Sequence, residues 1–320
     1  MQGIYKTKLS EEQLGRVVRA AFGCGLRGSS ELKDGWANSA YALELDDGRK
    51  AVLKARPSAD VRLMRCEVDV MKAEVEAMKH FERTEDLPIP RVYVYDPSKQ
   101  LLPVDYFIME HMEGTPLNRV KPELDDRQRE AIYRRLGEMN RRINEVVGTG
   151  FGFVADPHST TWRDAFAEMI YGALADGRDA GVDLPVPYAE LERRIEERLD
   201  VMKEVSEPRL LHWDIWDGNV FVKDGAVSAI IDFERAIWGD PVMENYFGRF
   251  YRELRAFREG YGMEVNDPSR IARRKLYDLY LDLLLYIECA YRQYDNQDHV
   301  RWTRDNLVQG LASFDETGSI

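Results

Sequence analysis

The sequence predicts an α+β fold of two unequal lobes, a small antiparallel sheet with one inserted helix followed by a larger, mainly helical part. Short runs rich in β-branched and aromatic residues dominate the chain up to about residue 111. Amphipathic helical patterns dominate the remainder, and a single hairpin signal interrupts them. We therefore expect a first lobe over residues 1–111 and a second over residues 112–320.

The first lobe is expected to begin with a helix over residues 10–22, which Gly23 ends. Strands over 40–45 and 50–55 follow, and Asp-Asp-Gly forms the turn between them. The helical spacing of apolar residues then predicts an inserted helix over 61–82, before two further short strands over 91–95 and 106–110.

The second lobe shows amphipathic or apolar helical patterns over most of its length. The helices are expected over residues 125–147, 160–176, 188–204, 243–258, 268–294 and 299–313. Residues 220–222 and 226–231 form the predicted hairpin, because Asp224-Gly225 is typical of a tight turn between strands.

Composition excludes several classes of protein. The chain has 320 residues, with 57 acidic against 45 basic side chains and a net charge of −12, which argues against a partner that is nucleic acid or an anionic membrane. Its three cysteines are widely separated, so neither a disulfide framework nor a cysteine zinc site is expected. Without an apolar span or a signal-peptide core, we expect a cytoplasmic protein. The oligomeric state stays open.

The segment LLHWDIWDGNVFVKDGAVSAIIDFE, residues 210–234, groups oxygen ligands. Antiparallel pairing about the turn sets Val220 opposite Ala229 and brings Asn219 and Asp232 to the same open end. Asp214 lies five residues before Asn219, close enough for the loop to bring its carboxylate there. Two carboxylates and an amide oxygen suit Mg²⁺, and phosphoryl transfer needs a metal and a carboxylate that takes a proton.

The letters HWDIWDGN and IIDFE resemble the H-x-D-x-x-x-x-N catalytic loop and the metal-binding Asp of the aminoglycoside phosphotransferase and choline kinase group. That group has a protein-kinase-like fold, which the resemblance implies here. It also implies that Asp214 is the catalytic base, that Asn219 and Asp232 hold Mg²⁺, and that His212 supports the loop. Trp213 departs from the pattern, where most relatives carry Gly, so its bulk beside the base would reshape the acceptor pocket.

The first lobe contains matching parts in the expected order. Lys54 lies in the apolar strand AVLKA, where an ammonium is costly unless it meets an anion such as an ATP phosphate. The resemblance implies that Glu74 holds Lys54 by an ion pair. It further implies a phosphate-covering turn in KDGWANSAY and an adenine-binding hinge in YFIMEHMEG, with nucleotide-binding groups at Gly35, Asn38, Ser39, Glu110 and Met112.

The acceptor site is expected on the helical lobe, facing Asp214. Aromatic and acidic side chains are the candidates, because together they suit an amine-bearing, polyhydroxylated acceptor. We select Trp216, Glu234, Trp238, Glu244 and Glu288. Glu244 stands in GDPVMEN, which resembles the family's G-D-P-x-x-D.

Other nucleotide-site signals are rejected. GCGLRG at 23–28 has the letters of the dinucleotide fingerprint, but a helix precedes it and a strand follows, the reverse of what that site needs. No G-x-x-x-x-G-K-[ST] occurs. A hydrolytic His/Asp metal site built on His158 is also disfavoured, because that histidine lacks a ligand spacing.

The expected function is that of a Mg²⁺-dependent small-molecule O-phosphotransferase, which moves the γ-phosphate of ATP to a substrate hydroxyl, with GTP as an open alternative donor. An aminoglycoside-type acceptor would make it an antibiotic-resistance enzyme. One alternative is a metabolite kinase acting on a sugar, a choline-like amine or a glycated amine. A nucleotide-binding pseudokinase or scaffold is another, and the complete set Lys54, Glu74, Asp214, Asn219 and Asp232 disfavours it.

Overall fold

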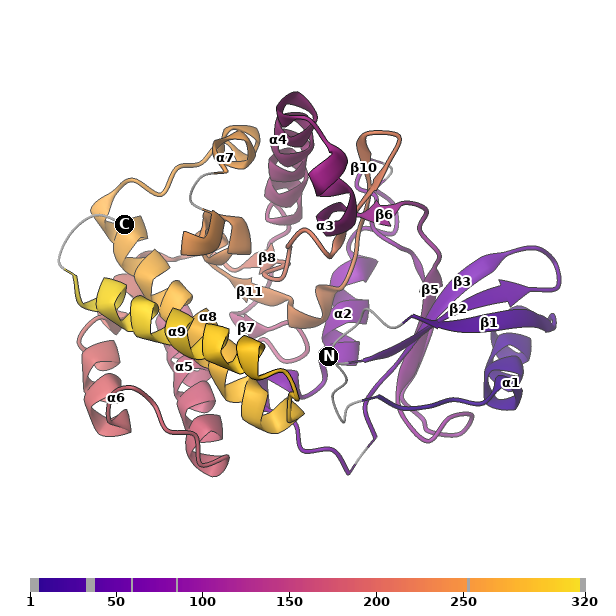
Figure 1. Cartoon of the computed structure of the whole chain (residues 1–320), viewed down its shortest axis with the longest axis horizontal. Coiled ribbons are helices and arrows are strands. Elements are labelled where there is room, and N and C mark those ends of the chain that lie inside the picture. Colours follow the sequence, from indigo (N-terminus) through magenta and orange to yellow (C-terminus); the bar gives the residue numbers. More distant parts are fainter. Residues whose placement is uncertain (1–5, 33–37, 59, 85, 252–253, 317–320) are drawn as a thin grey trace.

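The computed structural model describes residues 6–32, 38–58, 60–84, 86–251 and 254–316. It confirms the predicted fold class, with a sheet-rich part beside a larger helical part. In Figure 1 the first sheet lies on the right, most of the later helices lie on the left, and α2 (Val70–Lys79) lies between them. The lobe boundary at residues 111 and 112 stays a prediction.

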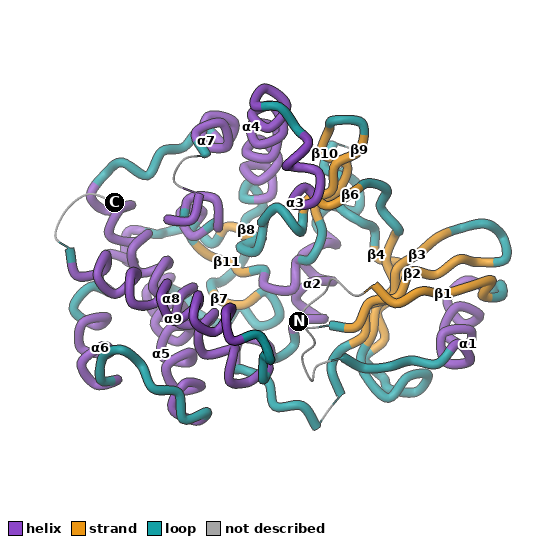
Figure 2. The backbone as a smooth tube through the Cα atoms, in the orientation of Figure 1, coloured by secondary structure: helices purple, strands orange, loops and turns teal. Residues whose placement is uncertain are grey.

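The first lobe is a five-stranded antiparallel sheet in the order β1-β2-β3-β5-β4. Its strands, drawn in orange in Figure 2, are β1 (Leu26–Leu32), β2 (Ser39–Leu45), β3 (Lys50–Ala55), β4 (Val92–Asp96) and β5 (Tyr106–Glu110). Four of them match the predicted strands. The sequence analysis missed β1 because this edge strand, LRGSSEL, is largely polar and has no fully buried residue.

Helix α1 (Glu11–Phe22) confirms the predicted first helix and covers one face of this sheet. Ser10 and Gln13 form a capping box at its start, and Gly23 ends it with φ of 71°. Its buried side chains Leu14, Val17 and Val18 belong to the apolar cluster of the sheet. Local end signals therefore place the helix, and packing on the sheet stabilises it.

The inserted helix is shorter than the predicted span of residues 61–82. Helix α2 begins at Val70, because Asp69 has φ of 60° and only a short 3-10 turn (Arg65–Glu67) precedes it. The carboxylate of Glu67 accepts hydrogen bonds from the backbone N of Met64 and the guanidinium of Arg292. These contacts tie residues before α2 to the helical lobe instead of extending the helix.

The helical lobe contains α3 (Leu117–Val120), α4 (Asp126–Ile143), α5 (Trp162–Asp179), α6 (Tyr188–Glu196), α7 (Arg255–Tyr261), α8 (Pro268–Arg292) and α9 (Gln297–Asp315). The expected helix over 243–258 is wrong: three 3-10 turns precede the short α7. Arg274 donates to the carbonyls of Val242 and Glu244, which a continuous helix would use itself. The expected helix over 188–204 likewise ends at Glu196, before a 3-10 turn (Leu199–Glu204).

Two small sheets lie within the helical lobe. The predicted hairpin is confirmed as β9 (Val220–Lys223) and β10 (Ala226–Ile230), which pair with β6 (Thr115–Pro116). Its register differs by one residue, since an irregularity between Val227 and Ala229 places Ile230 opposite Val220. The second sheet has the order β7-β11-β8, from Gly152–Phe153, Ile237–Gly239 and Arg209–Leu211. The sequence analysis missed these strands because each has only two or three residues.

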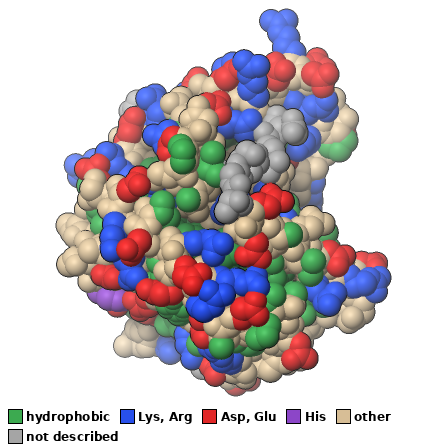
Figure 3. Space-filling view, turned by 90° about the vertical axis from the view of Figure 1, so that its left-hand side faces the viewer, with side chains coloured by type: hydrophobic (Ala, Val, Ile, Leu, Met, Phe, Trp, Pro, Cys, Tyr) green, Lys and Arg blue, Asp and Glu red, His purple; other side chains and the backbone are tan. Residues whose placement is uncertain are grey.

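The two lobes share one apolar cluster. It joins Val52 of β3 and Met109 of β5 to Met78 of α2 and Leu136 of α4. On the face shown in Figure 3, acidic and basic side chains are intermixed. Among the described helices, none is both long and apolar enough to span a membrane.

Candidate active site

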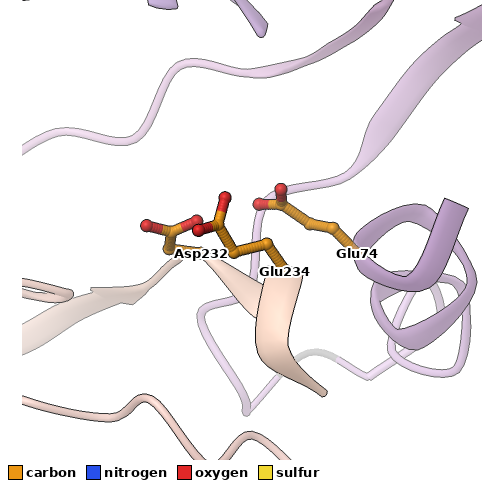
Figure 4. A group of neighbouring side chains, drawn as sticks. All are labelled: Glu74, Asp232 and Glu234. Atoms are coloured by element: carbon orange, nitrogen blue, oxygen red, sulfur yellow. The ribbon is translucent and has the colours of Figure 1, made fainter. Parts of the chain in front are cut away.

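A buried ammonium group connects the two lobes. Lys54 Nζ, from β3, lies 2.6 Å from Glu74 Oε2 of α2 and 2.7 Å from Asp232 Oδ1, just after β10. Glu234 Oε2 is 3.9 Å from the same nitrogen. The three carboxylates face one another in Figure 4, and each offers an oxygen within 4.8 Å of the others. The expected Lys54–Glu74 ion pair is present.

The carboxylates keep Lys54 charged. Burial alone lowers the pKa of Lys54, but Asp232 and then Glu74 outweigh it and raise that pKa above its usual range. Burial likewise opposes ionisation of Asp232, and Lys54 reverses the effect and lowers the pKa of that carboxyl. Glu234 also accepts a hydrogen bond of 2.6 Å from Asn38 Nδ2, which brings Asn38, just before β2, to the cluster.

Asp214 lies in the loop between β8 and β9. The amide nitrogen of Asn219 donates to the backbone oxygen of Asp214 at 2.9 Å and lies 3.3 Å from its carboxylate Oδ2. Burial raises the pKa of Asp214 to about 7, and Arg235 is the strongest charged influence in the opposite direction. The loop therefore holds a carboxyl group whose protonation changes near neutral pH, as a general base requires.

The open end of the hairpin meets Asn219 as the sequence predicts, despite the shifted register. The backbone N of Ile231 donates to the backbone carbonyl oxygen of Asn219 at 3.0 Å, so Asp232 follows directly beside the loop that holds Asp214. Asp232 has φ of 72°, a left-handed conformation that turns the chain out of β10. His212 is fully buried, and its Nε2 contacts the Ile231 oxygen at 3.0 Å. This contact fits the loop-supporting role that the resemblance implies.

Glu244 lies behind this loop and away from an acceptor pocket. Its carboxylate accepts from the backbone N–H groups of His212 at 3.0 Å and Trp213 at 2.9 Å, and from the side-chain amides of Asn140 and Asn144. The side chain is buried, with 1% of its surface exposed. The structure therefore does not support the acceptor-binding role chosen for Glu244, because four donors already occupy its oxygens.

Asp217 is a structural residue of the loop that the sequence analysis did not select. Its carboxylate accepts from Lys121 Nζ at 2.7 Å and from the hydroxyls of Tyr133 and Tyr246 at 2.9 Å. These donors come from three separate parts of the helical lobe. The only sequence signal was an additional acid between Asp214 and Asn219.

Trp213 occupies a strained position in the same loop. Its φ of 60° is in the left-handed region, which explains why glycine suits this position in the resembling family. The indole is buried and stacks on Tyr280, with ring centroids 5.4 Å apart and an interplanar angle of 19°. The guanidinium carbon of Arg235 lies 6.0 Å from the indole centroid.

The other residues chosen for acceptor binding lie in different surroundings. Trp238 is in β11 and packs edge-to-face on His80, the residue that follows α2, so it belongs to the core and not to an acceptor cleft. Glu288 is buried and pairs with Arg235 at 2.9 Å, whereas Trp216 is half-buried against Gly218.

The nucleotide-side candidates lie around the first sheet. Ser39 is buried at the start of β2, and Glu110 and Met112 lie at and after the end of β5. The backbone N of Glu110 donates to the backbone carbonyl oxygen of Arg91 at 2.8 Å. Gly35 lies outside the described residues.

The donor set fits a magnesium ion. Asp232 places one carboxylate oxygen on Lys54 and keeps 29% of its side chain exposed. Asn219 uses its amide nitrogen toward Asp214, which leaves its oxygen as the atom for a cation. Hard oxygen donors of this kind suit Mg²⁺, and Glu234 adds a carboxylate that the sequence analysis assigned to the acceptor.

Comparisons with known proteins agree with this geometry. The model of the APH family, described as the phosphotransferase enzyme family, matches residues 29–272. A Staphylococcus aureus protein named as a probable ketoamine kinase is 25% identical over 309 residues, which cover 89% of this chain and 94% of that protein.

Solved structures share the fold. Aminoglycoside phosphotransferase APH(4)-Ia, in a complex with AMP-PNP and hygromycin B, has a TM-score of 0.69 at 20% identity, over 95% of this chain and 100% of that one. A candidate fructosamine-3-kinase of Thermobifida fusca has a TM-score of 0.63 at 20% identity, over 92% and 98% of the two chains. Because the family match covers well over half of its length, the chain belongs to the phosphotransferase enzyme family, as its catalytic-loop motif predicts.

Proposed function

We propose that this phosphotransferase transfers the γ-phosphate of Mg²⁺-bound ATP to a hydroxyl group of a small molecule. The observation that carries the proposal is the buried Lys54 ammonium, shared by Glu74 and Asp232 at the junction of the lobes. A permanently charged, oriented ammonium is suited to the α- and β-phosphates of a nucleotide. The AMP-PNP bound to the solved neighbour supports ATP as the donor.

The other nucleotide-binding roles are assigned from where the residues lie around Lys54. Asn38 and Ser39 stand at the end of the phosphate-covering turn, and the backbone around Glu110 and Met112 forms the hinge for the adenine. Asn219 and Asp232 would hold Mg²⁺, which neutralises phosphate charge when it is bound. Glu74 keeps Lys54 in place.

Asp214 orients the acceptor hydroxyl and takes its proton. A bond forms between the acceptor oxygen and the γ-phosphorus, while the bond from that phosphorus to the bridging oxygen breaks and ADP leaves with the electron pair. The proton passes from the hydroxyl to Asp214 and then to solvent. Burial of Asp214 supports this role, because a carboxylate with a raised pKa is a stronger base.

Two acceptor classes are consistent with the relatives. The solved neighbour binds hygromycin B, an aminoglycoside, and the Staphylococcus aureus relative is named as a ketoamine kinase. Both classes carry several hydroxyls and an amine, in agreement with the cationic acceptor that the sequence suggests. The placement of all five predicted nucleotide and catalytic side chains at one junction supports an enzyme over a scaffold.

The direct test is ADP release from Mg²⁺-ATP with a panel of aminoglycosides, ketoamines, amino sugars, choline and neutral sugars. We expect stimulation by at least one class, a product heavier by one phosphoryl group, and a loss of about 10²–10⁴-fold in kcat for Asp214→Asn. Asp224→Asn is the matched control, because Asp224 is exposed in the hairpin turn. Equal rates for the wild type and Asp214→Asn would refute the proposed base.

A further inference from the structure

A narrow pocket lined by arginine and glutamate side chains adjoins the proposed active site. Its walls come from the residues after β3, the segment before α2, and the residues that follow Asp232. Three arginines and two glutamates line it, against a net charge of −12 for the whole chain: Arg56, Arg235, Arg292, Glu67 and Glu234. Arginines therefore gather on the side of the site next to Trp213, where Arg235 and Arg292 both contact the buried Glu288.

Both carboxylates in the wall are already engaged. Glu67 accepts from Arg292 at 2.6 Å and from the backbone N of Met64 at 3.0 Å. Glu234 accepts from Asn38 at 2.6 Å. Arg292 is engaged in turn, with Glu67 and Glu288, so Arg235 is the lining arginine that we consider for a ligand.

Arg235 is held in place on two sides. Its Nη2 donates to Glu288 Oε2 at 2.9 Å, and its guanidinium carbon lies 6.0 Å from the centroid of the Trp213 indole. The indole is fixed in turn by its stacking on Tyr280. Yet 18% of the Arg235 side chain stays exposed, and a guanidinium has five N–H donors, of which this pair uses one.

Arg235 also acts electrostatically on the proposed base. It follows Asp232 by three residues, and after burial, which raises the pKa of Asp214, it is the strongest influence on that carboxyl and lowers its pKa. A fixed, partly exposed guanidinium of this kind is suited to a carboxylate, which it can bind through two parallel hydrogen bonds.

We propose that Arg235 binds a carboxylate of the acceptor, so that the preferred substrate carries a carboxylate close to the hydroxyl that is phosphorylated. This inference rests on the proposed function and narrows it. A ketoamine formed from an amino acid has such a carboxylate beside its hydroxyls, whereas aminoglycosides are polycations without one. Trp213, whose indole centroid lies 6.0 Å from the guanidinium carbon, is a positioning residue in this proposal.

The test compares acceptors that differ only in this group. Fructosyl-glycine is paired with fructosyl-glycinamide, and 2-amino-2-deoxygluconate with its amide, and kcat/KM is measured for each. We expect the acid to be preferred by about 10- to 100-fold in the wild type, in line with a hydrogen-bonded charge pair. Arg235→Gln should bring the ratio close to one, and Arg235→Lys should restore part of it.

The ratio separates binding of the acceptor from other effects of Arg235. Its charge acts on Asp214 equally for both members of a pair, so this effect cancels. Had Arg235 bound the transferred phosphate instead, Arg235→Gln would slow both members equally, and an unchanged ratio would overturn the proposal. Arg178→Gln is the matched control, because its exposed pair with Glu192 lies between α5 and α6.

A second variant controls for an effect of Arg235→Gln on folding. Arg235→Gln leaves the buried Glu288 beside only Arg292, so the double variant Arg235→Gln/Glu288→Gln, which removes both charges, is measured as well. Phosphorylation of aminoglycosides without that of either acid would refute this inference and leave the proposed function intact. ADP release that no acceptor stimulates would refute both.

Discussion

Trp213 shows how one residue can combine backbone strain with tight packing. Its φ of 60° is unfavourable for a side chain with a β-carbon, yet only 4% of the residue is exposed and it stacks on Tyr280. Glu244 accepts its backbone N–H at 2.9 Å and so holds the loop in this conformation. The departure from the family's usual glycine was visible in the sequence, but the compensating contacts were not.

We expect Trp213→Gly to destabilise the protein despite relieving the strain. Removing a large buried side chain costs roughly 3–5 kcal/mol, and the left-handed conformation costs a residue with a β-carbon roughly 1–2 kcal/mol. The free energy of unfolding should thus fall by about 1–4 kcal/mol in urea denaturation. Asp224→Gly is the control, because Asp224 also has positive φ but is exposed, so it loses no buried packing and should stabilise the protein by up to about 1–2 kcal/mol. A stabilised Trp213→Gly protein would contradict this account.

The pH profile of kcat/KM should report Asp214. Its pKa is raised to about 7 by burial, so the base is protonated and inactive below that pH and ionised above it. The rate should fall about tenfold per pH unit below 7 and level off above it. Arg235→Gln removes a charge that lowers this pKa, and its profile should move to higher pH. A limb near pH 4, the ordinary value for aspartate, would be inconsistent with a buried base.

At the scale of elements, the pairing of α4 with α7 supports the catalytic loop. Phe257 of α7 packs on Tyr246, with ring centroids 4.8 Å apart, and Tyr246 donates to Asp217 within the loop. The two helices approach closely because each presents a glycine to the other, Gly137 in α4 and Gly260 in α7. A β-carbon on Gly137 would meet the backbone oxygen of Phe257. The contact requires glycine for close approach and not for an unusual φ.

Gly137→Ala should therefore separate these helices. Overpacking of this kind costs roughly 1–3 kcal/mol, and we expect a loss of that size in the free energy of unfolding. Gly15→Ala in α1 is the matched control, since no atom lies within 4 Å of its added β-carbon. It should stabilise the protein by about 0.5–1 kcal/mol, because alanine is the better helix former. Equal effects of the two substitutions would refute the close approach.

Elements with strong local signals could be predicted and those that depend on distant partners could not. Asp224-Gly225 identified the hairpin and Ser10 to Gly23 bounded the first helix, since turn and cap chemistry is local. Residues 243–254 have apolar residues at helical spacing, but Arg274, from α8, takes the carbonyls there. The polar edge strand β1 also escaped prediction, because it lacks a buried face.

At the scale of the molecule, the junction of the lobes forms both the site and part of the core. Asp214, Asn219 and Asp232 could be grouped from the sequence because they lie in one short segment around a hairpin. Lys54 and Glu74 were paired only through the family resemblance. Glu234 and Arg235 could not be placed, since their partners Asn38 and Glu288 are distant along the chain.

Titration calorimetry with Mg²⁺ and AMP-PNP tests the central claim most directly, namely that Lys54 at this junction binds a nucleotide. The wild type and Lys72→Ala, which removes a lysine with 45% of its side chain exposed, should bind alike. Lys54→Ala should bind at least about 10-fold more weakly, because it loses a charge-assisted contact to phosphate. No binding by the wild type, or equal affinity for Lys54→Ala, would contradict the account.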